Sequence, residues 1–265
     1  MAVARKADAL IEAGGEEGER LRLHRVPLEA FSTVYSFLAA LGGYEGKKWD
    51  QLTTTEAEDQ VLSLRSLRGW TFLHWAANDD SRAKLAGVIA ARKPGLANAK
   101  ENMSGDTPLH YAAMRGREAM ARVLLAVGAD KKAQNNDGLT PLHMAMNHRG
   151  EAVVRELLAA GADKHAKNND GDTPLHLAGS EAVARVLLAA GADKHAKNYG
   201  GCTPLHKAAR SNNEEMARTL LAAGADKHAQ DAHGNTPLHL AQGNGWNPLN
   251  EAQEKNHEAL MALLS

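Results

Sequence analysis

A short phrase recurs along the chain at a nearly constant interval, and this repetition constrains the fold more than any other feature. The tetrapeptide Thr-Pro-Leu-His begins at Thr107, Thr140, Thr173, Thr203 and Thr236, with intervals of 33, 33, 30 and 33 residues. A degenerate copy, Thr-Phe-Leu-His, begins at Thr71. The phrase Gly-Ala-Asp keeps step with the tetrapeptide, at Gly128, Gly161, Gly191 and Gly224. A shared period of this length indicates a stack of small structural units of one design.

Each unit is expected to hold two helices and a loop. Thr caps helix N-termini well, and Pro suits the first helical position because its missing N–H would be unpaired there. In the second helix, apolar residues follow helical spacing, as at Met120, Val123, Leu124 and Val127. The glycine of Gly-Ala-Asp then ends the helix, and Asn/Asp-Gly segments such as 135–138 predict a tight turn. The unit therefore reads helix, turn, helix and hairpin-like loop.

The composition agrees with close stacking of helices. Hydrophobic residues make up 43% of the chain but aromatic residues only 4%, and 49 residues are alanine. A helix pair of this size cannot bury its apolar face alone and must pack on its neighbours. Small pairs such as Ala112-Ala113 and Ala208-Ala209 allow adjacent units to approach closely. An all-β sandwich, which favours β-branched and aromatic residues, is disfavoured.

The two phrases closely resemble the ankyrin repeat, in which Thr-Pro-Leu-His-x-Ala-Ala opens the unit and Gly-Ala-Asp follows its second helix. The resemblance covers about residues 69–264 and about six repeats. It implies an all-α repeat solenoid, an ankyrin-repeat stack of helix-turn-helix units with β-hairpin-like loops. It also implies that a concave face and the hairpin tips bind another protein.

Three departures from the family pattern stand out. The 30-residue interval arises because segment 177–181 replaces a longer turn between the two helices. The last unit gains residues around 242–248 before a closing helix that we expect over 251–264. Finally, lysine follows Gly-Ala-Asp where the family commonly has a hydrophobic residue, which predicts a more polar hairpin face. These lysines are Lys131, Lys164, Lys194 and Lys227.

Residues 1–65 carry no repeat signature and are expected to form an N-terminal helical extension that caps a repeat domain over 66–265. An amphipathic helix is predicted over 27–41. A second helix is predicted to begin at a Thr55-x-x-Glu58 capping box and to end near residue 67. Eight of the eleven aromatic residues lie between residues 31 and 75, which suits a segment that seals the end of a stack.

Charge and cysteine content exclude several classes of function. Lys and Arg number 31 against 32 Asp and Glu, so the net charge of −1 does not favour binding to nucleic acid or an anionic membrane. The single cysteine, Cys202, excludes an intrachain disulfide framework and fits a reducing compartment. No signal peptide or membrane-spanning run is found. The chain is expected to be cytoplasmic and monomeric, or alternatively a secreted effector without a cleavable signal peptide.

The histidines and lysines invite chemical hypotheses, but structural roles are favoured. Successive histidines of the repeat signature are one unit apart, too far to share a metal ion. A second row, His165, His195 and His228, is expected to lie on a solvated hairpin face. The lysine row there is preceded by Asp163, Asp193 and Asp226, which should largely cancel its field. Catalytic motifs are absent, so we expect no enzyme activity, no cofactor and no metal.

Specificity is expected where side chains vary while the scaffold repeats. The candidate partner-binding residues are Asp106, Met114, Arg115, Leu139, Met144, Asn147, His148, Asp172, Tyr199, Lys207, Arg210 and Asn235, and Cys202 varies with them. The favoured function is a non-enzymatic module that binds a protein as an adaptor or an immunity-type inhibitor. Two alternatives remain, an exported bacterial effector that binds host proteins, and a regulatory or catalytic activity residing in the N-terminal extension.

Overall fold

The computed structural model describes residues 69–146, 150–243 and 251–265, and these residues contain helices and loops but no β-strand. They fall into two compact units. The first combines residues 69–112 with Arg117–Asp130, and the second combines Ala113–Gly116 with Lys131–Ser265. The helices predicted over 27–41 and 55–67 lie outside the described residues, so the N-terminal cap and its boundary at residue 65 stay predictions.

The first unit is built around α7 (Ala83–Arg92), which packs against α6 (Phe72–Ala76) and α9 (Glu118–Ala126). Two short 3-10 helices, η1 (Asp80–Arg82) and η2 (Pro94–Asn98), flank α7, and α8 (Pro108–Met114) begins in this unit. Phe72, Ile89, Leu109 and Leu124 are fully buried. Of the residues that the helical spacing predicted to face the core, Met120 and Leu124 are fully buried, whereas Val123 and Val127 are only partly buried.

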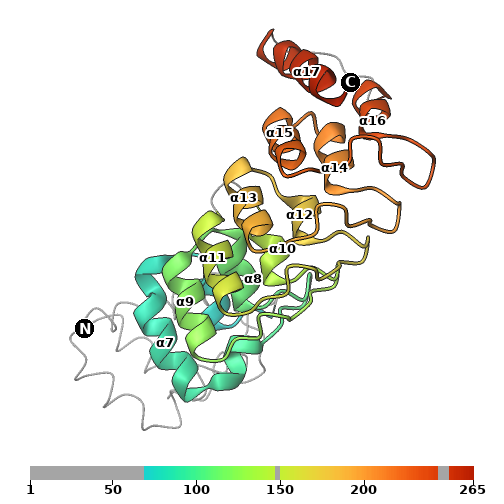
Figure 1. Cartoon of the computed structure of the whole chain (residues 1–265). Coiled ribbons are helices and arrows are strands. Elements are labelled where there is room, and N and C mark those ends of the chain that lie inside the picture. The colour runs from blue at the N-terminus through green and yellow to red at the C-terminus, as the bar shows by residue number, and fades with distance from the viewer. Residues whose placement is uncertain (1–68, 147–149, 244–250) are drawn as a thin grey trace. The chain divides into compact units, whose positions relative to one another are not determined.

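The second unit contains four successive helix pairs. Their first helices are α10 (Pro141–Met144), α12 (Pro174–Leu177), α14 (Pro204–Arg210) and α16 (Pro237–Gly243). Their second helices are α11 (Glu151–Ala159), α13 (Glu181–Ala189), α15 (Glu214–Ala222) and α17 (Glu251–Leu264). Each first helix packs against the next first helix, and each second helix against the next second helix. Within this unit, the loops after α11, α13 and α15 project to the same side (Figure 1).

The predicted helix phasing is confirmed in the second helices. Val153 and Leu157 of α11, Val183 and Leu187 of α13, and Leu220 of α15 are all fully buried. Each second helix therefore buries one apolar face against the second helices of the neighbouring repeats. The predicted all-α repeat of helix-turn-helix units is confirmed by this arrangement.

The helix termini follow the local chemistry of the repeated phrases. At α10, α12 and α14 the threonine is the N-cap, Pro occupies the first turn, and the signature histidine completes a reciprocal capping box. At the other end, Gly161, Gly191 and Gly224 adopt φ values of +82°, +84° and +83°. This left-handed conformation costs glycine little, so the glycine ends the second helix as predicted.

The deletion predicted in the turn of the shortened repeat falls instead in its first helix. The segment between α12 and α13, 178–180, is as long as the segment between α14 and α15, 211–213, whereas α12 has 4 residues and α14 has 7. Gly179 N–H donates to the Met146 carbonyl at 2.8 Å, and Ser180 caps α13. In the last unit, the closing helix is α17, Glu251–Leu264, as predicted. Residues 244–250 of the insertion lie outside the described residues.

Candidate protein-binding surface

The loops between helix pairs of the second unit are closed by one repeated set of hydrogen bonds. In the loop that contains Asn168, its N–H donates to the Asp172 carbonyl at 3.0 Å. The Asn168 Oδ1 in turn accepts the N–H groups of Asp170 and Asp172 at 3.0 and 2.8 Å. Equivalent backbone closures begin at Asn135, Asn198 and Asp231. Each loop is thus a hairpin-like turn whose polar backbone groups are satisfied locally.

Neighbouring loops of the second unit are also bonded to one another. Asn169 N–H donates to the Asp137 carbonyl at 3.0 Å, Tyr199 N–H to the Asp170 carbonyl at 3.1 Å, and Ala232 N–H to the Gly200 carbonyl at 3.0 Å. A single backbone bond per loop keeps the loops aligned without forming a β-sheet. The loops therefore present their side chains from a fixed backbone.

The signature histidine of each of these repeats contacts the loop that follows the same repeat. The Nε2 atoms of His143, His176 and His206 lie 3.1, 3.0 and 3.0 Å from the carbonyls of Asp172, Cys202 and Asn235. Their Nδ1 atoms accept the N–H of the N-cap threonine, at 3.1 Å for Thr173 and His176. Both ring nitrogens are used when the ring is neutral and protonated on Nε2. The structural role predicted for these histidines fits these bonds.

Acid should destabilise the protein because two of these rings are buried in the neutral form. Burial lowers the pKa of His176 and of His206, although the carbonyls of Cys202 and Asn235 oppose the shift. The unfolded chain then binds more protons than the folded chain as pH falls through the ordinary histidine pKa of about 6.5. We expect the free energy of unfolding, measured in urea, to fall from pH 7.5 toward pH 5.5. His176→Gln should flatten this dependence, and a dependence as steep as that of the unmodified chain would contradict the assignment.

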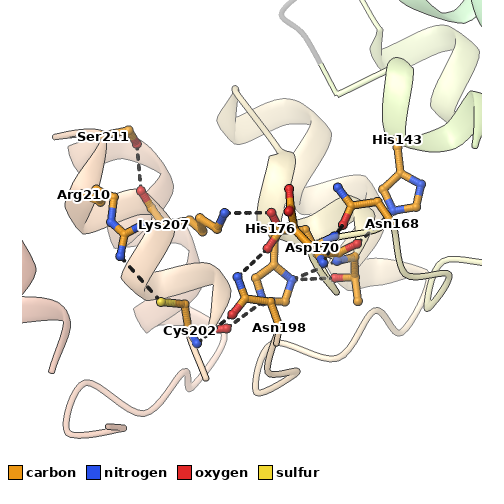
Figure 2. Close-up of polar contacts among 11 residues, drawn as sticks. His143, Asn168, Asp170, His176, Asn198, Cys202, Lys207, Arg210 and Ser211 are labelled. Carbon is orange, nitrogen blue, oxygen red and sulfur yellow. Dashed lines mark hydrogen bonds and ion pairs between the residues drawn. The ribbon is translucent and has the colours of Figure 1, made fainter. Parts of the chain in front are cut away.

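A largely buried ion pair joins the loop that contains Asp172 to helix α14. The Asp172 carboxylate, whose side chain is 2% exposed, accepts Lys207 Nζ at 2.7 Å and Asn198 Nδ2 at 2.7 Å. Lys207 reaches this carboxylate from α14, and Asn198 reaches it from the next loop; Figure 2 labels Lys207 and Asn198. The sequence predicted Asp172 and Lys207 as candidate residues, and the structure brings them together.

Cys202 and Arg210 lie beside this pair. The Cys202 side chain is buried, and its Sγ accepts a long hydrogen bond of 3.7 Å from Arg210 Nη2 (Figure 2). Burial raises the pKa of the Cys202 thiol, partly opposed by the nearby Arg210 charge. A buried thiol with a raised pKa is a poor nucleophile. The site therefore offers contact and charge rather than thiol chemistry.

Tyr199 is the most prominent apolar group of the loops. Its side chain is 72% exposed, and Lys167 Nζ lies 5.6 Å from the ring centroid. The ring rests on Gly171, where φ is +78° and a methyl group would lie 2.8 Å from Tyr199 Cδ1. Only glycine tolerates both this backbone conformation and this close approach. Tyr199 is therefore exposed but held in place.

The other predicted residues have varied environments. Asp106 is buried in the first unit, where its carboxylate accepts Ser104 Oγ at 2.6 Å and its carbonyl lies 3.0 Å from His74 Nε2. Arg115 is exposed. Partial exposure is found at Met114, Leu139, Met144 and Asn235. Asn147 and His148 lie outside the described residues. The partner-binding role of all these residues stays a prediction.

Two positions of the loops were not recognised as structural from the sequence. Gln134 Nε2 donates to the Lys167 carbonyl at 3.2 Å, Lys167 Nζ to the Lys197 carbonyl at 2.9 Å, and Lys197 Nζ to the Gln230 carbonyl at 2.9 Å. The four residues share one position in the repeat, which is the signal that could have identified them.

The lysines that follow Gly-Ala-Asp also pack against the next repeat. The Lys164 and Lys194 stems pass near Gly191 and Gly224, where a methyl group would lie 3.7 and 3.6 Å from Cε.

The described residues hold no group of three or more His, Cys, Asp or Glu side chains placed to bind a metal ion. In the same part of the chain, no helix is long and apolar enough to span a bilayer.

Comparison with known proteins identifies the repeat. A family model for three copies of the ankyrin repeat matches residues 37–135 and 125–198, and a second model for many copies matches residues 183–241. The first match begins inside the segment predicted to be an N-terminal cap. The human ankyrin repeat domain-containing protein SOWAHB is 34% identical over 125 residues, which cover 42% of this chain and 15% of that protein. The chain therefore spans only a small part of this relative.

Proposed function

Because the chain belongs to the ankyrin-repeat family, whose repeats are generally protein–protein interaction modules, we propose that its second unit binds a protein partner through the loop face. We define the loop face as the loops spanning 162–173, 192–203 and 225–236 together with the exposed side of α14. We propose further that the chain acts as an adaptor or an inhibitor, by covering a surface of the protein that it binds.

The observation that carries this proposal is the fixed backbone of the loop face. Bonds within and between loops hold Tyr199, and the ion pair of Asp172 with Lys207 joins a loop to α14. A surface that is ordered before binding loses little conformational entropy when a partner docks. The loop face exposes Tyr199 and Arg210, and tyrosine and arginine are the residue types that commonly dominate binding energy at interfaces.

Affinity capture with the full chain, followed by calorimetry with the purified captured protein, tests the proposal. We expect Tyr199→Ala to weaken binding by about tenfold or more, since interface hot spots of this type cost at least ~1–2 kcal/mol. Arg210→Glu should weaken it as well. Arg185→Glu, on the exposed face of α13, is the matched control and should leave affinity unchanged.

Two results would count against the proposal. One is the failure of the folded chain to retain any protein that binds it directly after purification. The other is an affinity that changes equally in all three variants. If the captured protein is an enzyme, loss of its activity on adding the chain would favour the inhibitor role over the adaptor role.

A further inference from the structure

Lysine recurs at two positions on the loop face, three residues apart. The five residues are Lys164, Lys194 and Lys227, which follow Gly-Ala-Asp, and Lys167 and Lys197. Within the described part of the chain, no carboxylate lies within 4 Å of any of their ammonium groups. These cations are therefore available to a binding partner.

The carboxylates that balance these lysines in the sequence are directed elsewhere. Asp163, Asp193 and Asp226 each turn Oδ1 toward the backbone N–H two residues later, at 2.8, 2.8 and 2.9 Å. Asp172 is paired with Lys207. Asp231 is buried and accepts the N–H groups of its own loop. Each of these carboxylates is thus engaged within its own loop or by Lys207, and none of them forms an ion pair with the five lysines.

Two of the lysines are also held in position. Lys167 and Lys197 each donate one hydrogen bond to a backbone carbonyl of the next loop, both at 2.9 Å. A neutral carbonyl fixes the ammonium group without cancelling its charge, and the ammonium has further N–H donors to offer. Positioned cations of this kind recognise carboxylates at lower entropic cost than mobile surface lysines do.

An open groove of about 430 Å³ lies between the loops 192–203 and 225–236, and of the five lysines Lys197 lines it. Its lining includes His195, Lys197, His228 and Gln230, with Asp226 also on its wall. After Asp193, the loop 192–203 contains no acidic residue, and it carries the exposed Tyr199. The groove thus combines one lysine and two imidazoles with one carboxylate, and Tyr199 belongs to a loop that borders it, with its ring against Gly171 of the preceding loop.

We infer that this groove and the lysines around it bind an acidic segment of the protein partner. Aspartate or glutamate side chains of that segment lie against Lys194, Lys197 and Lys227, and its apolar atoms pack on Tyr199. Charge complementarity selects the partner and speeds encounter, while Tyr199 supplies buried area. This inference rests on the proposed function, because it names the chemistry of the partner at the same surface.

A short fluorescein-labelled peptide of alternating Glu and Asp is the probe, and fluorescence anisotropy with the full chain is the measurement. We expect binding at low salt that weakens as salt is raised, and no binding of the matching Gln/Asn peptide. The double variant Lys194→Glu with Lys227→Glu should bind the acidic peptide at least about tenfold more weakly. Circular dichroism should show that this variant stays folded, because both side chains are partly exposed and their ammonium groups form no ion pair with the described residues.

The control variant is Arg185→Glu with Arg218→Glu. It makes the same change in net charge, on the second helices of the same two repeats, where both arginines are exposed. Equal loss of peptide binding in the two double variants would overturn the inference, because net charge alone would then account for binding. Equal or tighter binding of a single-stranded oligonucleotide at the same lysines would also overturn it, in favour of a nucleic-acid ligand.

The two proposals fail in distinguishable ways. A captured protein that binds through Tyr199 but is insensitive to Lys194→Glu with Lys227→Glu would overturn the acidic-partner inference and leave the proposed function intact. Peptide binding at these lysines by a chain that retains no protein would overturn the proposed function and leave only the preference of these lysines for acidic peptides.

Discussion

Leu187→Ala should lower the free energy of unfolding by about 2–5 kcal/mol, the range for truncating a buried leucine in a core. Leu187 lies in α13, which packs between α11 and α15, and its side chain is fully buried. The substitution removes buried apolar surface and leaves a cavity where α13 packs against α11 and α15 of the neighbouring repeats. Because each repeat is stabilised mainly by its neighbours, the loss should affect both adjoining layers.

Urea unfolding followed by circular dichroism measures this effect, and Leu188→Ala provides a matched control. Leu188 is the next residue of the same helix but is only partly buried, so its truncation should cost about 1 kcal/mol or less. Similar losses in the two variants would contradict the helix phasing described above.

Lys207→Met should destabilise the protein more than Asp172→Asn, although both break the same ion pair. Replacing Lys207 leaves a buried carboxylate with Asn198 but no counter-charge, and an uncompensated buried charge costs about 3 kcal/mol or more. Replacing Asp172 leaves Lys207, whose side chain is 27% exposed and can turn toward water. That loss should be about 1 kcal/mol, the value of an ordinary hydrogen bond.

A double-mutant cycle in urea checks this asymmetry. We expect the double variant to be more stable than Lys207→Met alone, since removing the carboxylate relieves the uncompensated charge. Equal and additive losses would show that the pair contributes no coupling. Lys207 is therefore a poor position at which to test partner binding. Weaker binding by a Lys207 variant would reflect either a destabilised fold or a lost contact with the partner. Tyr199 and Arg210 are therefore the cleaner positions at which to test binding.

Much of the fold followed from local chemistry that is written in every copy of the repeat. The threonine caps, the prolines of the first turn and the terminal glycines each act within a few residues of themselves, so their effect does not depend on distant contacts. The buried positions of α11, α13 and α15 likewise followed from helical spacing. The shortened unit and the closing helix were predicted because insertions and deletions stand out against a constant period.

The candidate site could be predicted only in part. Variation against a repeated background singled out Tyr199, Lys207 and Arg210, which are at least partly exposed, but it also singled out Asp106 and Asp172, which are buried. Variation shows where packing does not prescribe a residue type, and it does not show which side chains remain exposed. The hydrogen bonds of Lys167 and Lys197 could not be predicted, since nothing in one loop reveals that the carbonyl of the next loop lies within reach.

By itself, the sequence determined the repeated unit, where each of its helices begins and ends, and which helix face is buried. Tertiary structure alone decided which charged side chains of different repeats pair with one another. Asp172 and Lys207 are 35 residues apart and meet only because stacking places the loop of one repeat beside the first helix of the next. By contrast, the orientation of Asp163, Asp193 and Asp226 is local, because each carboxylate accepts the N–H two residues later in its own loop. Composition can count such charges, but only the packed structure separates the paired from the exposed, because pairing requires contact and contact depends on the fold.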